Sequence, residues 1–168
     1  MQETKTIDCI IDNTNENIDI DIAQWQEIGI NLFKNLCSHK EISQNFCLKD
    51  KDFSKIFFDI TFMDSTQTHE LNRTYREKDY PADIITFALF ADDENSQILD
   101  GEIVLGDIII ALDKVQEMAL SENKSFDWEL KFLIAHGILH LLGFDHQTIG
   151  EYDFVVQHQN TAIEELNQ

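Results

Sequence analysis

Hydrophobic residues recur along the chain at intervals that mark out short strands and amphipathic helices. Between Lys55 and Met63 they occupy every second position, which indicates a strand with one buried face. Between Ala23 and Leu36 they recur every three or four residues, which indicates a helix. The same reasoning predicts strands over Thr6–Ile11, Lys55–Met63, Asp83–Phe90 and Glu102–Ile110, and helices over Ala23–Leu36, Asp64–Tyr75, Leu112–Leu120, Phe126–Leu142 and Glu151–Leu166.

Polar residues mark the ends of several of these elements. Asp64, with Gln67 three residues later, has the pattern of a capping box, and Ser125 is placed to cap the helix that follows it. The polar segment Asp92–Gly101 predicts a hairpin between two strands. This mixture of strands and helices predicts an α+β fold in which residues 1–168 form a single domain, with a small mixed sheet of about four strands covered by helices.

Composition and charge narrow the class of protein. The 168 residues suit one domain, and the 43% hydrophobic content supplies a core, so a wholly disordered chain is excluded. The formal net charge of −20 argues against a general nucleic-acid coat, although a small positive site on an acidic body stays compatible with it.

Membrane and secretory signals are not found in the sequence. No apolar run reaches the roughly 18 residues that a membrane helix needs, and Met1–Asp12, with one lysine and three acidic residues, is not the pattern of a signal peptide. The three cysteines form no CxxC motif, which suits free thiols in a reducing cytoplasm.

Three of the six histidines, His136, His140 and His146, fall within eleven residues. The first two are four residues apart on a predicted helix, so their rings project from one face about one turn apart. Gly143 ends that helix and lets the chain reverse, which allows His146 to return to the same ion. Three neutral imidazoles around Zn²⁺ leave a fourth position for water, so the spacing predicts one zinc ion per chain.

The alternative is an apolar core helix with two hydrogen-bonded histidines. Neutral imidazoles on such an apolar helix need explicit partners, and three histidines at these intervals favour a metal as that partner. The spacing also matches the metzincin proteases, whose catalytic glutamate follows the first histidine. Here that position is Gly137, which can neither take nor give a proton, so peptide hydrolysis lacks its usual general base.

Arg73 and Arg76 are the only arginines of the chain, and with Lys78 they form a local positive spot. The guanidinium group suits phosphate because its fork donates two parallel hydrogen bonds. The alternative is that these cations only pair with Glu70, Glu77 or the helix end.

The histidine segment resembles the YbeY family, the metal-dependent bacterial endoribonucleases of ribosomal RNA maturation. The family pattern HGxLHLxGxDH is met at every fixed position from His136 to His146. Two further blocks, residues 71–87 and 105–108, follow the family's order and spacing, so the resemblance covers most of residues 55–150. It implies an α+β fold, a bound zinc and a cytoplasmic role in ribosome quality control and in maturation of the small-subunit RNA 3′ end.

By the same resemblance, Arg76 matches the arginine of the family's cleft and ranks above Arg73. We therefore predict that Arg76 and His136 act in catalysis, and that His136, His140 and His146 hold the metal. Single-stranded ribosomal RNA is the expected substrate, and the ribosome or its associated proteins are the expected partners. The oligomeric state stays open, and a monomer is compatible with the sequence.

Two questions about function stay open at this level. The nucleophile is either a zinc-bound hydroxide or the 2′-hydroxyl of the RNA, and the sequence does not choose between them. The alternatives to a ribonuclease are a metal-dependent hydrolase of another substrate, such as peptide, and a ribosome-associated zinc protein without activity. Structural zinc normally has four protein ligands, and only three are evident here, which disfavours the last alternative.

Other residues are weaker candidates, each with a structural alternative. Asp145 either orients a ligand histidine or caps the next helix, and Asp107 either lines the cleft or ends a strand. Three aromatic residues, which either stack on bases or pack in the core, are Tyr75, Tyr80 and Phe87. The histidines expected as ordinary surface residues are His39, His69 and His158.

Overall fold

The structure is a computed structural model in which residues 4–168 are described, so the start of the N-terminal segment considered above, residues 1–3, lies outside the described residues. Within the described range, four strands and six helices follow one another. They are β1 (Thr6–Asn13), α1 (Ile22–Ser38), α2 (Lys40–Ser43), β2 (Lys55–Met63), α3 (Ser65–Arg76), β3 (Ile84–Phe87), β4 (Glu102–Ala111), α4 (Leu112–Ser121), α5 (Phe126–Leu141) and α6 (Ile149–Glu165).

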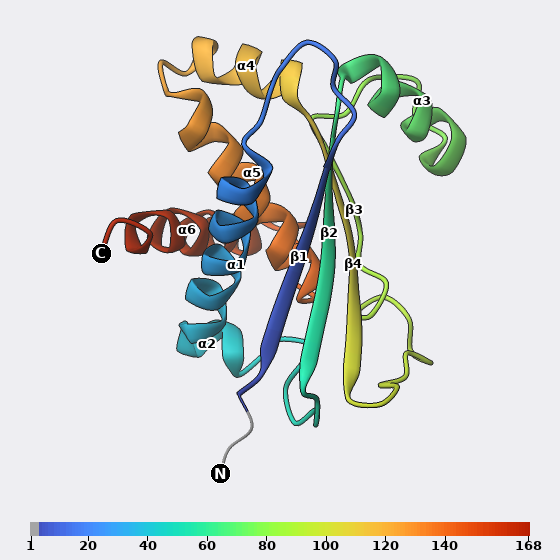
Figure 1. Ribbon diagram of the computed structural model, residues 1–168, viewed down its shortest axis with the longest axis vertical. Coiled ribbons are helices and arrows are strands. Elements are labelled where there is room, and N and C mark those ends of the chain that lie inside the picture. The colour runs from blue at the N-terminus through green and yellow to red at the C-terminus, as the bar shows by residue number, and fades with distance from the viewer. Residues whose placement is uncertain (1–3) are drawn as a thin grey trace.

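The strands form one mixed sheet in the order β1-β2-β4-β3. β1, β2 and β4 are parallel neighbours, and β3 pairs antiparallel with β4. Figure 1 shows α1, α5 and α6 gathered on one side of this sheet, with α3 on the other side at one end. The predicted α+β class, with a small mixed sheet covered by helices, is therefore confirmed.

The main core lies between the sheet and the helices α1, α5 and α6. The even-numbered residues of β2, from Ile56 to Phe62, are buried, which gives the alternation expected of a strand with one core face. α5 is apolar around most of its circumference because it packs against the sheet and against other helices. A smaller cluster under α3 joins Ile85 and Ile109 to Leu71.

Helix ends follow the predicted capping signals. Asp64 and Gln67 form a complete capping box at the start of α3, and the Ser125 side chain accepts a hydrogen bond from the Trp128 backbone N–H at the start of α5.

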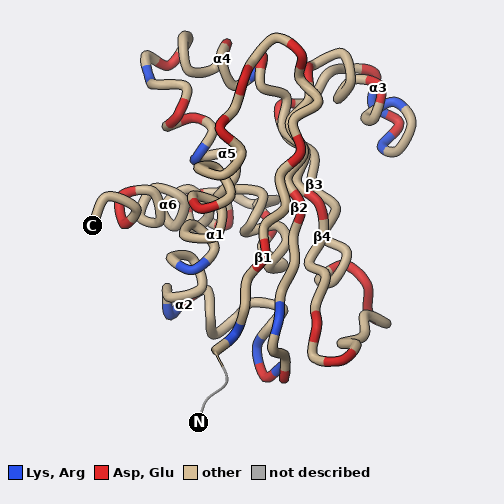
Figure 2. The backbone as a smooth tube through the Cα atoms, in the orientation of Figure 1, with Lys and Arg blue, Asp and Glu red and all other residues tan. Residues whose placement is uncertain are grey.

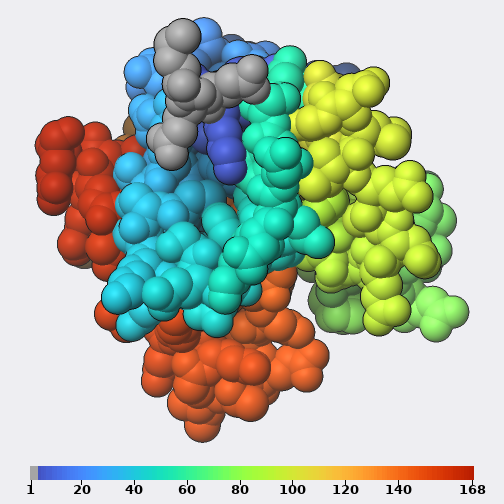
Figure 3. Space-filling view, turned by 90° about the horizontal axis from the view of Figure 1, so that it is seen from below, coloured from blue at the N-terminus to red at the C-terminus, as the bar shows by residue number. Residues whose placement is uncertain are grey.

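In the space-filling view, the yellow segment that joins β3 to β4 lies on the opposite side of the molecule from the red α6 (Figure 3). None of the helices in residues 4–168 combines the length and apolar character needed to cross a membrane.

Several element boundaries differ from the predictions by one to three residues, and one short helix was not predicted. β3 ends at Phe87 rather than Phe90 because the Leu89 N–H already bonds to the Phe87 carbonyl in a turn. α6 begins at Ile149, before the predicted start, because Thr148 supplies a second capping box. The four-residue helix α2 was not predicted, since one turn is too short to show a periodic pattern.

Gly137 lies where α5 packs directly on β4. A Cβ atom at this position would lie 2.8 Å from Ile108 Cγ2 and 2.9 Å from its Cδ1, inside a fully buried contact. We expect Gly137→Ala to lower the free energy of unfolding by about 1 kcal/mol, because overpacking costs about 2 kcal/mol, the middle of its usual range, and the gain in helix propensity offsets about 1. Gly150→Ala is the matched control, since a Cβ there meets nothing within 4 Å. Urea unfolding of both variants checks this, and equal stability would show that the packing at Gly137 is not tight.

Candidate active site

Two elements bring His136, His140 and His146 together. The first two histidines lie one turn apart on α5, which ends at Leu141. Gly143 then adopts a φ of +97°, and this left-handed turn redirects the chain toward His146. The Nε2 atoms of His136 and His140 are 3.0 Å apart, and one ligand nitrogen from each of the three histidines lies within 4.8 Å of the others.

This arrangement fits a tetrahedral metal ion. Zinc–nitrogen bonds of about 2.0–2.1 Å place two ligand nitrogens about 3.3 Å apart, close to the 3.0 Å between His136 and His140. Burial lowers the pKa of His136, and burial, followed by the neighbouring His136 and His146, lowers the pKa of His140 to about 4. Both rings are therefore neutral at pH 7, which is the protonation state that binds a metal.

Gln159 of α6 orients one of the three histidines. Its amide NH₂ group donates to the Phe132 carbonyl at 2.9 Å, so its Oε1 faces His136 Nδ1 at 3.3 Å and accepts a hydrogen bond from the Nδ1–H group. This leaves the His136 Nε2 lone pair directed at the site. Gln159 was not predicted from the sequence; the one signal there was a polar residue at helical spacing from the apolar Val155 and Ile163.

The histidines lie in an open cleft of about 460 Å³. Its walls come from the end of α3, from β3, and from α4, α5 and α6. Besides the three histidines, its lining includes Arg76, Asp83, Ile84, Thr86, Met118, Phe132, Leu133, Asp145, Tyr152, Val156 and Gln159. Figure 2 shows acidic segments spread over much of the backbone, whereas α3 carries basic segments beside acidic ones, and Arg76 of α3 lines the cleft. A positive group thus reaches the histidine site of a strongly acidic protein.

The two arginines of α3 have different surroundings. Arg73 donates to Asp79 Oδ1 from Nε at 3.2 Å and from an Nη at 2.9 Å, and it does not line the cleft. Arg76 lines the cleft, and one of its Nη groups donates to Asn72 Oδ1 at 3.3 Å. Asn72 is fully buried and is itself fixed by a 2.9 Å bond to the Tyr80 carbonyl. Arg76 therefore has a rigid support and further N–H groups available for a ligand.

The weaker acidic candidates have structural surroundings. Asp145 lines the cleft, but its carboxylate accepts from the His146 backbone N–H at 2.7 Å and from the Gln147 amide at 2.9 Å, so it stabilises its own loop. Asp107 of β4 lies outside the cleft lining, beside Asp59 in the sheet. Burial, followed by the charge of Asp59, raises the pKa of Asp107.

The three aromatic candidates lie outside the cleft lining. Tyr75 is 68% exposed and meets the edge of Phe87 at 6.3 Å between ring centroids, and Tyr80 is also exposed. Phe87 belongs to the small cluster under α3, which is the structural alternative considered for it. None of the three lines the cleft, whereas Tyr152, which was not predicted, does.

An α+β domain with three histidines converging in an open cleft defines a protein with an accessible metal-binding site. Three protein ligands and an open approach are typical of catalytic metal sites, while structural sites are closed by a fourth ligand. The class is therefore that of metal-dependent enzymes.

The family model described as "Endoribonuclease YbeY" matches residues 10–167. The chain therefore belongs to the YbeY family of endoribonucleases, enzymes that hydrolyse phosphodiester bonds of RNA. The sequence-based assignment to this family is confirmed.

Relatives and a solved structure agree with this assignment. The Endoribonuclease YbeY proteins of Staphylococcus aureus strains bovine RF122 / ET3-1 and JH9 are each 45% identical over 106 residues, which cover 62% of this chain and 68% of theirs. The solution structure of TM1509 from Thermotoga maritima is 22% identical, with a TM-score of 0.52 over 95% of this chain and 91% of that one. This second likeness supports the fold.

Proposed function

We propose that residues 1–168 form one zinc-dependent endoribonuclease domain that cuts single-stranded RNA, and that its substrate is the 3′ end of small-subunit ribosomal RNA. The observation that carries the proposal is that the three-histidine site and Arg76 line the same cleft. The family resemblance supports a place for this activity in the cytoplasm, in ribosome maturation and quality control, with ribosome-associated proteins as partners.

In this proposal His136, His140 and His146 hold one Zn²⁺ per chain. Their three nitrogens leave one coordination position for water or substrate. When bound, the ion supplies a Lewis acid for a phosphoryl oxygen and lowers the pKa of a water ligand. Gln159 keeps the proton of His136 on Nδ1, away from the site, so that Nε2 stays available as a ligand.

Arg76 is the residue that binds the scissile phosphate in this proposal. Its guanidinium is held by the buried Asn72 at one N–H, and its other donors can bond to phosphate oxygens on which negative charge develops. The apolar side chains of Phe132 and Leu133 line the same cleft beside the histidines. They reduce the local dielectric, which strengthens the interaction between the arginine and the phosphate.

The cleft suits one strand rather than two. A paired, A-form helix keeps its backbone stacked and rigid, so it cannot bend its phosphates into a short cleft, whereas a single strand can. The acidic body repels RNA, but this repulsion is screened over about 8 Å at physiological salt. Few cations then anchor the phosphates, so cleavage is expected to fall as salt is added.

RNA cleavage by highly purified, zinc-loaded protein tests the proposal. We expect single-stranded RNA to be cut, duplex RNA of the same sequence to resist, and casein to stay intact, since Gly137 cannot replace the protease glutamate. An RNA with one 2′-deoxy sugar at the cut position distinguishes the two candidate nucleophiles, zinc-bound hydroxide and the 2′-hydroxyl. A block confined to that site identifies the 2′-hydroxyl as the nucleophile. If the protein cuts casein and leaves the RNA intact, it is a peptide hydrolase rather than a ribonuclease.

A further inference from the structure

A second cluster of titratable side chains joins α6 to the turn between α1 and α2. His39 Nδ1 lies 2.8 Å from His158 Nδ1. The outer nitrogens of the same rings face carboxylates: His39 Nε2 lies 3.0 Å from Glu165 Oε2, and His158 Nε2 lies 3.0 Å from Glu41 Oε2. The result is one continuous row of four side chains, Glu165–His39–His158–Glu41.

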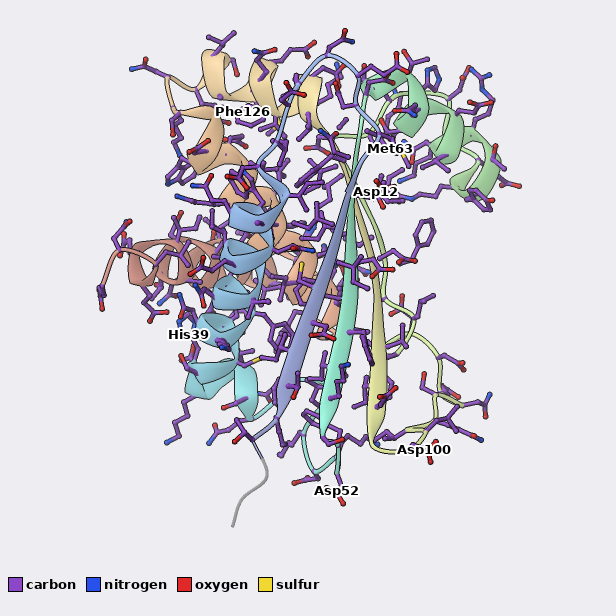
Figure 4. All side chains as sticks on the ribbon, viewed as in Figure 1. Asp12, His39, Asp52, Met63, Asp100 and Phe126 are labelled. Carbon is purple, nitrogen blue, oxygen red and sulfur yellow. The ribbon has the colours of Figure 1, made fainter. Side chains whose placement is uncertain are left out.

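The prediction that His39 and His158 are ordinary surface residues is wrong. His158 is 7% exposed, and the His39 side chain is 11% exposed. Figure 4 labels His39 at the end of α1, beside α2. The Phe154 ring covers His158 at a centroid distance of 4.4 Å. The two rings are therefore shielded from water and depend on each other and on the carboxylates for hydrogen bonds.

The hydrogen-bond inventory of this row requires three protons. An ionised carboxylate only accepts, so both Nε2 atoms must carry a hydrogen. The 2.8 Å contact between the two Nδ1 atoms needs one further hydrogen, donated by one ring to the other. Two neutral imidazoles carry only two hydrogens on nitrogen. The row is therefore complete only when one of the two rings is an imidazolium.

We propose that His39 and His158 form a binding site for a single proton, and that this proton fastens α6 to the turn between α1 and α2. With one proton fewer, a ring lone pair faces a carboxylate. With one proton more, the two Nδ1–H groups point at each other. Both changes remove a hydrogen bond made by a shielded imidazole ring, although the Glu41 carboxylate at one end of the row is 67% exposed. The folded protein therefore selects the state with one imidazolium between two carboxylates.

The hydrogen-bond geometry requires the bound proton, and the charged groups around the pair act on it in both directions. The charged groups that act on His158 are Glu41 from α2, Glu165 from α6 and the His39 ring. Burial is the largest effect and lowers the pKa of His158, the Glu41 hydrogen bond raises it, and the His39 ring lowers it again, so the net shift of the His158 pKa is downward. The carboxylates therefore favour a first proton on the pair, while burial and the neighbouring ring oppose a second.

The position of the His39–His158 pair links it to the metal site. His158 is followed directly by Gln159, whose side chain orients His136. An anchor at His158 fixes the rotation of α6 about its axis, and with it the direction of the Gln159 amide. The proton thus stabilises a helix that supports a metal ligand, without contacting the cleft itself.

Nitrogen-15 NMR of histidine-labelled, zinc-loaded protein at pH 7 counts the protons directly. We expect three of the four ring nitrogens of His39 and His158 to carry hydrogen, with signals assigned by His39→Gln. Glu165→Gln keeps the shape of the side chain, but its amide can donate to His39 Nε2, so two neutral rings then complete the row. We expect the count to fall from three to two in this variant.

Glu164→Gln is the matched control, because Glu164 is the exposed neighbour on α6, and it should leave the count at three. A count of two in the wild-type protein, whether from a neutral pair or from a metal ion between the Nδ1 atoms, would overturn the proposal. A count of three that persists in Glu165→Gln would overturn it as well, because the carboxylate would then not be what holds the proton. Neither result depends on whether the protein cuts RNA.

Discussion

Replacing His140 by alanine is expected to abolish zinc binding and RNA cleavage together. His140 lies at the centre of the site, with its Nε2 3.0 Å from that of His136. Removal of an outer hydrogen-bond partner of a ligand already costs about 10- to 100-fold in metal affinity, so loss of a ligand itself is expected to cost more than about 100-fold. Elemental analysis after dialysis should show one zinc per wild-type chain and none in His140→Ala.

His69→Ala is the matched control for this loss. His69 lies on α3 and bonds to Asp79 at 2.8 Å, outside the histidine site. It should keep one zinc per chain. If His140→Ala and His136→Ala both retain a full equivalent of zinc, the ion is held elsewhere and the ligand assignment is wrong.

Arg76→Ala is expected to keep its zinc and its fold but to lose about 10²- to 10³-fold in kcat, the effect of removing one preorganised donor to a developing negative charge. Arg76→Lys should recover little, because an ammonium cannot reproduce the two parallel bonds of a guanidinium. Single-turnover cleavage of a defined single-stranded RNA, with zinc content measured on the same samples, checks both variants.

Arg73→Ala separates the role of Arg76 from that of positive charge in general. Both arginines lie on α3, but Arg73 is bonded to Asp79 and does not line the cleft. Its removal should therefore change kcat little, while weakening binding at low salt through the loss of one cation. Equal losses in the two alanine variants would mean that only the net charge of this helix end matters.

The metal site was predictable because its pattern is local. His136 and His140 share one helix face, and Gly143 signals where the chain turns, so an eleven-residue segment contains most of the geometry. Gln159 was not predictable in the same way, because its contact with His136 depends on how α6 packs against α5. The alternation of hydrophobic and polar residues likewise predicted β2, whereas the order of the strands in the sheet came only from the structure.

The contact between His39 and His158 was even less predictable from the sequence than that of Gln159. His39 and His158 are 119 residues apart, and each alone resembles a surface histidine in its sequence context. The preference of polar residues for the surface is a statistical rule, and the informative exceptions are buried polar groups whose partners lie far along the chain. Local periodicity contains no information about such partners.

The parallel pairing of β2 with β4 has a consequence for synthesis of the chain. Lys55 of β2 aligns with Glu102 of β4, so the centre of the sheet closes only after the intervening residues, including α3 and β3, have been made. Contacts between such distant segments form slowly, because the loop between them must first be ordered. All three site histidines follow β4, and α6, which supports His136, follows them. All four strands are therefore synthesised before the three site histidines, and a chain that stops before α6 lacks the supports of both His136 and His39.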